Sequence, residues 1–239
     1  MTPKVTWAEK LKRWQKGQNE ATARALMSPP AKTTLLQSIP FPGVVIIMGS
    51  RGSGKTGLAH EIMSQLHNRR RLGGALLLPT VPRGKSRVLP SWVKVVMSIS
   101  QLPKRSVCII DEAAQVAHAR RSQSATAVQL DNLVSISRHR QQLILFISHH
   151  SRKLDLNLIH DSDRILWKQP TEAHALFERD ELQLFTRKAL EFFAGIKGEK
   201  ARQKATYIMD LHHLQFTWFN NSLPSWWSET ISHGFQDYR

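Results

Sequence analysis

The chain has 239 residues, a formal net charge of +16 and a single cysteine, Cys108. This length fits one α/β domain with appendages. One cysteine excludes an internal disulfide and a cysteine-based zinc site, and it fits a reducing, intracellular setting. No apolar run reaches the roughly 18 residues that a membrane-spanning helix needs, so we expect no transmembrane segment.

The positive charge is concentrated in the first half of the chain. Residues 1–120 hold 19 Lys/Arg and 5 Asp/Glu, whereas the remaining residues hold 15 and 13. Because basic side chains neutralise phosphates and release counterions, this asymmetry favours a nucleic-acid partner. The alternatives are a solvated basic surface, an anionic lipid surface or an acidic partner protein.

Residues 1–38 are predicted to form a separate basic segment. Trp7, Leu11 and Trp14 recur at helical spacing among basic residues, which indicates a short amphipathic helix. This helix could pack on its own domain, dock on a neighbour or lie on a membrane surface. We expect the core domain over residues 39–198 and a C-terminal extension that packs on it over 199–239.

From residue 41 onward, strand and helix patterns alternate. A continuous apolar run at 43–48, typical of a strand buried on both faces, precedes a glycine-rich turn and a helix from about 56 to 68. Further strands are expected at 75–78, 93–97, 107–110, 143–147, 164–167, 206–209 and 215–218. Further helices are expected at about 125–138 and 172–193. This order predicts an α/β fold with a mostly parallel sheet covered by helices on both faces.

A phosphate-binding motif follows the first buried strand. It matches G-x-x-x-x-G-K-[ST] and consists of Gly49, Ser50, Arg51, Gly52, Ser53, Gly54, Lys55 and Thr56. The glycines let backbone N–H groups turn toward phosphate oxygens, and the start of the next helix favours anions. We expect Lys55 to reach the β- and γ-phosphates of ATP and the Thr56 hydroxyl to ligate Mg²⁺.

Two adjacent acids, Asp111 and Glu112, end the apolar strand at 107–110. Ligands of open α/β sheets lie at the carboxyl ends of the strands, so Asp111 should lie near the phosphate loop. Asp111 is suited to hold Mg²⁺ through its water shell, and Glu112 to orient and deprotonate an attacking water. Such a base favours hydrolysis over phosphate transfer to another acceptor.

The strand at 143–147 ends in Ser148, His149 and His150. In this kind of sheet, the end of that strand lies beside the γ-phosphate, so Ser148 or His149 could sense the nucleotide or position water. Neighbouring residues on a strand point to opposite faces, so the two histidines cannot easily share one metal ion. We expect structural roles for this histidine pair and for the pair at 212–213.

Arginines flank the same strand. Arg138, Arg140 or Arg152 could reach the active site of a neighbouring subunit and stabilise the charge of phosphoryl transfer, but the sequence does not select one of them. Other basic residues are candidates for phosphate-backbone contacts that do not read sequence. These are Arg69, Arg70, Arg71, Arg83, Lys85, Arg87, Arg120 and Arg121.

Over residues 40–230, the order of these elements resembles the FtsK/HerA superfamily, and in particular viral genome-packaging ATPases and zonula-occludens-toxin-like phage assembly proteins. The matching segments are residues 49–56, Asp111-Glu112-Ala113, Ser137-Arg138-His139-Arg140, Ser148-His149, the 154–165 segment and Leu223-Pro224-Ser225-Trp226-Trp227-Ser228. Family members often have Gln or Asn where Ser148-His149 stands. The toxin-like proteins usually carry a transmembrane helix, so its absence from this sequence favours a packaging motor.

The resemblance implies a RecA-like P-loop core that binds ATP and Mg²⁺, and a ring of subunits, often six, around double-stranded DNA. It also implies possible contacts with viral capsid or membrane vertex proteins, and a place in the host cytoplasm or the virion. A DNA-translocating ATPase is therefore the leading hypothesis. A nucleotide-gated assembly protein that moves no DNA and a small-molecule kinase are the alternatives.

Overall fold

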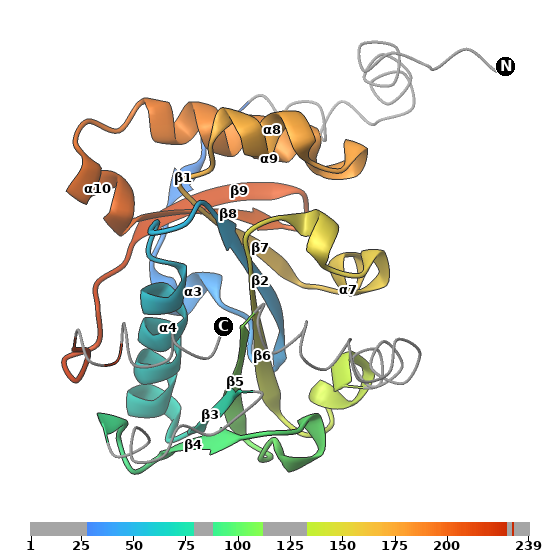
Figure 1. The fold of residues 1–239 in the computed structure, drawn as a ribbon, viewed down its shortest axis with the longest axis vertical. Helices are drawn as coiled ribbons and strands as arrows, with labels where there is room; N and C mark the ends of the chain where they lie inside the picture. Colours follow the sequence, from blue (N-terminus) through green and yellow to red (C-terminus); the bar gives the residue numbers. More distant parts are fainter. Residues whose placement is uncertain (1–27, 79–87, 112–132, 229–230, 232–239) are drawn as a thin grey trace, which may run out of the picture.

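A computed structural model describes residues 28–78, 88–111, 133–228 and 231. Its centre is a nine-stranded sheet with the order β1-β9-β8-β7-β2-β6-β5-β3-β4 (Figure 1). The strands are β1 (Ala31–Lys32), β2 (Gly43–Gly49), β3 (Gly73–Leu77), β4 (Val93–Val96), β5 (Ser106–Asp111), β6 (Gln142–Ser148), β7 (Arg164–Lys168), β8 (Ala205–Asp210) and β9 (Gln215–Asn220). The expected strands all form, and the mostly parallel α/β sheet is confirmed.

Helices lie on both faces of this sheet. The α-helices are α3 (Leu35–Ser38), α4 (Lys55–Arg70), α7 (Leu156–His160), α8 (Glu172–Phe177), α9 (Asp180–Ala194) and α10 (Glu199–Lys204). Residues 133–137 are also helical, within the helix expected at 125–138, whose earlier part lies outside the described residues. Among the described helices, none has both the length and the apolar character needed to cross a bilayer.

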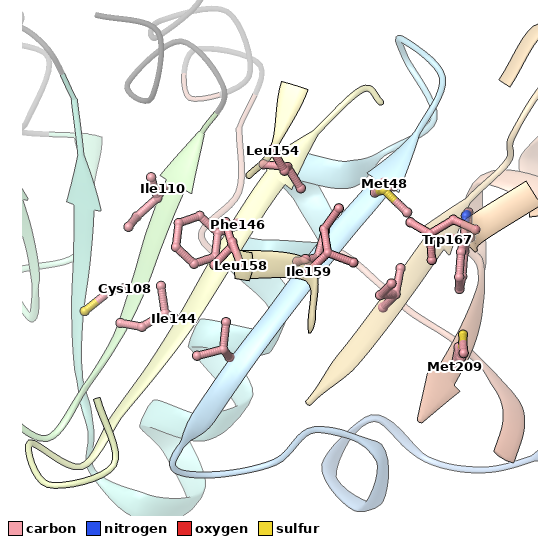
Figure 2. Packing of buried hydrophobic residues seen from close by; sticks show 14 of the residues in the cluster. Met48, Cys108, Ile110, Ile144, Phe146, Leu154, Leu158, Ile159, Trp167 and Met209 are labelled. Atoms are coloured by element: carbon pink, nitrogen blue, oxygen red, sulfur yellow. The ribbon is translucent and has the colours of Figure 1, made fainter. Parts of the chain in front are cut away.

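Alternating side chains of the central strands feed two hydrophobic cores. On one face, Ile46 and Phe146 pack with α7 and α9, as Figure 2 shows for Phe146 beside Leu158. On the other face, Val45 and Ile47 pack against α4. Every residue of β2 is buried, which explains why its sequence is continuously apolar rather than alternating.

The helix expected over residues 172–193 is interrupted, so that prediction was wrong in one respect. Glu178 and Arg179 are extended and separate α8 from α9. Glu178 is buried, and its carboxylate accepts hydrogen bonds from the Ser151 hydroxyl and from the Arg179 N–H. Because these bonds tie Glu178 to a distant part of the chain, tertiary contacts override the local helical preference.

Both ends of the described chain extend the same sheet. The antiparallel hairpin of β8 and β9 continues it beyond β7, and β1 pairs in parallel with β9. The predicted boundary at 38 coincides with the end of α3, and the one at 198 lies just before α10, with strands of the same sheet on both sides of each boundary. After β9, the chain runs back along α4 (Figure 1).

Candidate nucleotide-binding site

The phosphate-binding loop connects β2 to α4 at the carboxyl edge of the sheet. Gly49 ends β2, and a Cβ atom there would lie 1.8 Å from the backbone oxygen of Lys168, so a larger residue could not fit. Gly54 caps α4 with a φ of 92°, a left-handed conformation that glycine adopts without strain. The loop thus depends on glycine both for its close approach to β7 and for its entry into the helix.

Lys55 folds back over this loop and is only 6% exposed. Its ammonium donates hydrogen bonds to the backbone oxygens of Gly49 at 2.9 Å and Ser50 at 2.8 Å. Its Nζ also lies 3.2 Å from Nδ1 of His149. The lysine that the motif assigns to phosphate binding therefore lies at the start of α4, where the helix dipole favours an anion.

A cavity of about 800 Å³ opens beside the loop. The loop and the start of α4 contribute Arg51, Gly52, Gly54, Lys55, Thr56 and Gly57 to its lining. Two serines stabilise the loop: the hydroxyl of Ser50 donates to Gln169 O, just after β7, and that of Ser53 donates to Ser50 O within the loop. The volume lies in the usual range of small-molecule sites, about 300–1,000 Å³.

Asp111 lines the same cavity although its strand does not touch β2. β6 lies between β5 and β2, with Asp111 opposite Ile147 and Ser148 opposite Met48. This register brings the ends of all three strands to one edge. The Thr56 hydroxyl and the Asp111 carboxylate are oxygen ligands of the kind that Mg²⁺ takes, so the lining fits the expected ion. Glu112 lies outside the described residues.

The polar side chains at the end of β6, Ser148, His149 and His150, have different surroundings. His149 lines the cavity, whereas the buried hydroxyl of Ser148 donates to His150 O at 2.8 Å and does not line it. His150 instead stacks on His174 with ring centroids 4.4 Å apart. Burial, and then the neighbouring His150, lower the pKa of His174 to about 4. His149 is thus better placed than Ser148 to meet a nucleotide.

Three arginines near β6 make contacts within the subunit. Arg138 is paired with Asp163 at 3.0 Å, and its side chain is 65% exposed. Arg140 donates to Leu102 O, and Arg152 to Glu178 O at 3.4 Å. None of the three lines the described part of the cavity. A role for Arg138 or Arg140 in a neighbouring subunit's site remains a prediction.

The paired histidines have separate contacts. His212 Nε2 lies 3.0 Å from Asp163 Oδ1, and His213 Nδ1 lies 2.8 Å from Asp210 Oδ2. Within the described ranges, no group of three or more His, Cys, Asp or Glu side chains could hold a metal ion. These contacts fit the structural roles expected from the sequence.

A second buried lysine near the loop was missed by sequence reasoning. Lys168, at the end of β7, is fully buried. Its Nζ donates to Gln203 O at 2.5 Å, Ala205 O at 2.8 Å and Asn221 Oδ1 at 2.7 Å. Burial lowers its pKa to about 7. The sequence did show a lysine at the end of an apolar strand. Its bonds could not be predicted, because Gln203, Ala205 and Asn221 lie 35 or more residues away along the chain.

Lys168 thereby holds together a second wall of the cavity. This wall comes from α10 and the segment that follows β9, and its place beside the phosphate loop was not expected from the sequence. Its two parts are Lys200, Gln203 and Lys204 on α10, and Asn221, Ser222, Leu223 and Trp227 after β9. The cavity therefore lies between the phosphate loop and a wall built almost 150 residues later.

Solved structures of viral proteins share this fold. The genome packaging NTPase B204 from Sulfolobus turreted icosahedral virus 2, in complex with AMPPCP, aligns with a TM-score of 0.53 at 15% identity, covering 76% of this chain and 98% of that chain. B204, the DNA-packaging ATPase from Sulfolobus turreted icosahedral virus, aligns over the same shares with a TM-score of 0.52 at 15% identity. No protein-family profile and no curated protein matches the sequence. The chain thus has a RecA-like P-loop NTPase fold, like that of a viral genome-packaging NTPase.

Proposed function

We propose that this protein hydrolyses ATP to translocate double-stranded DNA, as the genome-packaging motor of a virus. The observation that carries the proposal is that Lys55 and Thr56 line one cavity with Asp111, which comes from a separate part of the chain. The fold is shared with NTPases that are described as packaging viral genomes. The chain's concentration of positive charge supplies the argument for DNA.

In this proposal, Lys55 exchanges its carbonyl partners in the loop for phosphate oxygens when ATP binds. Thr56 and Asp111 would hold Mg²⁺, which neutralises phosphate charge during the reaction. Glu112, by its place after Asp111 in the sequence, deprotonates the attacking water. His149, next to Lys55 at the end of β6, would sense whether the terminal phosphate is present.

The proposed DNA contacts lie at the edge of the sheet opposite the cavity. We call them the basic edge: the exposed residues Arg69, Arg70, Arg71, Lys104 and Arg105. Backbone hydrogen bonds from Gly73 N to Arg105 O, and from Arg105 N to Arg140 O, link the starts of β3, β5 and β6 at this edge. Such residues would bind phosphates without reading bases. ATP and DNA would then occupy opposite edges of one rigid sheet.

The test is ATP hydrolysis measured with and without duplex DNA at low salt. We expect DNA to stimulate hydrolysis, and we expect Glu112→Gln and Asp111→Asn to abolish it. Hydrolysis that is indifferent to DNA would contradict the motor. If particles assembled with the Glu112→Gln variant contained normal DNA, the protein would be a nucleotide-gated assembly factor instead. Phosphate transfer to an acceptor other than water would identify a kinase.

The basic edge has its own test. Replacing Arg69, Arg70 and Arg71 with alanine should lower DNA-stimulated hydrolysis and leave basal hydrolysis unchanged. If all three contact phosphates, the slope of log affinity against log salt should fall by about 3. The matched control replaces the exposed residues Lys153, Arg187 and Lys197, which lie outside the edge. An equal loss in both triple variants would show that net charge, rather than this edge, attracts DNA.

A further inference from the structure

The second wall of the cavity carries an exposed apolar side chain. Leu223 is 55% exposed, although most leucines among the described residues are buried, and it lines the cavity. Trp227 lines the cavity as well and is partly buried. The loop side of the cavity is basic and polar, and the second wall is polar too, except at Leu223 and Trp227. These two side chains therefore form the apolar part of the second wall.

Contacts along α4 fix this segment in place. Ser222 donates to Glu61 Oε1 at 2.9 Å, and the indole N–H of Trp226 donates to Ser64 Oγ at 3.3 Å. Trp227 packs edge-on against His60, with ring centroids 5.0 Å apart. Because these contacts span about one turn of α4, from His60 to Ser64, the wall is attached to the same helix that begins at the phosphate loop.

Leu223 also lies directly against the start of that helix. A Cβ atom at Gly57 would come within 2.6 Å of Leu223 Cδ2, so glycine at this position lets the leucine approach. Gly57 follows Thr56, the last residue of the phosphate-binding motif. A ligand held by its phosphates at Lys55 and Thr56 thus meets Leu223 where it leaves the loop.

We propose that Leu223 and Trp227 form the subsite for the base of the bound nucleotide, with Gln203 at its edge. The inference rests on the proposed function, because it assumes that phosphates bind at Lys55. A cavity of about 800 Å³ has room for a whole nucleoside triphosphate. The flat face of the base packs against Leu223 and Trp227, and the ribose lies between them and the loop.

Gln203 supplies the polar contact that such a subsite needs. Its side chain is exposed at the cavity, and within the described part of the chain its amide has no hydrogen-bond partner. Its backbone oxygen accepts a hydrogen bond from Lys168, which holds this residue beside the wall. An amide offers both a donor and an acceptor, so it can bond to the edge of a base.

The test compares the binding of ATP and of inorganic tripolyphosphate by titration calorimetry. Leu223→Ala should weaken ATP binding about tenfold, since it removes apolar contact from a ligand pocket. Tripolyphosphate has no base, so its affinity should stay unchanged. Leu223→Met keeps apolar surface at this position and should restore most of the ATP affinity. Leu176→Ala removes a leucine that is 64% exposed on α8, outside the cavity, and should change neither ligand's affinity.

The outcomes separate this inference from the proposed function. If the unmodified protein binds both ligands and Leu223→Ala binds ATP as tightly as before, the base subsite is wrong and the phosphate site stands. If Leu223→Ala weakens both ligands equally, Leu223 shapes the loop rather than contacting a base. If the unmodified protein binds neither ligand, the proposed function and the subsite both fail.

Discussion

Two buried lysines lie on either side of the phosphate loop, and they differ in what they face. Lys55 lines the cavity, while Lys168 lies at the end of β7 and does not line it. Both ammonium groups donate to backbone oxygens: Lys55 to Gly49 and Ser50, Lys168 to Gln203 and Ala205. The two side chains make similar bonds, so bonding alone does not reveal which of them acts on a ligand.

The two lysines differ in whether a ligand can replace their hydrogen-bond partners. Lys55 bonds to its own loop beside open volume, so phosphate oxygens can replace those carbonyls. The partners of Lys168 come from α10, β8 and the segment after β9, and the side chain is fully buried. An unmade bond there would leave a buried acceptor unsatisfied, at a cost of about 1–3 kcal/mol. Lys55 is therefore placed to bind a ligand, and Lys168 to position the wall that the ligand meets.

The largest expected effect comes from Lys55→Ala. ATP hydrolysis should fall by about 100-fold or more, because the charge that stabilises the phosphates is lost. Thermal unfolding should change less than in Lys168→Met, because Lys55 lies beside the cavity rather than in the core. A steady-state phosphate-release assay beside a melting curve checks both points. A variant that unfolds as readily as Lys168→Met would erase the contrast between the two lysines.

Lys168→Met should give the reverse result. Losing three hydrogen bonds to buried acceptors while relieving the burial of an amine should cost about 2 kcal/mol of unfolding free energy, seen by urea denaturation. The wall would loosen, so KM for ATP should rise severalfold while kcat changes less. Lys197→Met, at an exposed lysine, is the control and should leave both quantities unchanged. A selective loss of kcat would instead place Lys168 in the chemistry.

A pH titration tests a buried histidine, His60, which packs against the second wall of the cavity. His60 packs on Trp226 and Trp227, and burial lowers its pKa from 6.5 to about 4. Between these pH values the unfolded chain binds a proton that the folded protein does not, so stability falls as the pH falls. The loss from pH 6.5 to about pH 5 should be about 1.5 kcal/mol.

His60→Gln isolates this contribution because glutamine does not titrate. The difference in urea unfolding free energy between the unmodified protein and this variant should depend on pH in that window and be flat above it. His174 is also held neutral, but it is present in both proteins and cancels. A flat difference at all pH values would mean that His60 is solvated.

The smallest effect is expected for Arg138, whose guanidinium faces solvent. Arg138→Ala removes an ion pair with Asp163, and such exposed pairs contribute less than about 1 kcal/mol. Asp163 keeps its bond from Val44 N at 2.7 Å and its contact with His212. If hydrolysis nevertheless falls in the assembled protein and is restored by mixing with Lys55→Ala subunits, Arg138 acts on a neighbour's site.

Features that depend on residues close together in the chain were predictable from the sequence, and features that depend on residues far apart were not. The buried strand at 43–48 and the helix after it were predictable, because each is defined by neighbouring residues whose burial sets their type. The break at Glu178 was not, because its partner is Ser151, in another element. The same holds for the residues that line the cavity with Thr56. Asp111 was predictable because it ends a local strand pattern, whereas no local pattern predicts the place of Leu223.

The sequence by itself determined the α/β class, the phosphate loop at 49–56 and the acid that ends β5, since spacing within short segments carries these features. Only the tertiary structure decided what faces the loop across the cavity. The β8–β9 hairpin extends the sheet beyond β7, and the chain then returns along α4, which brings Gln203, Asn221 and Leu223 beside Thr56. That meeting depends on buried Lys168 and on packing against α4, neither of which leaves a local pattern in the chain.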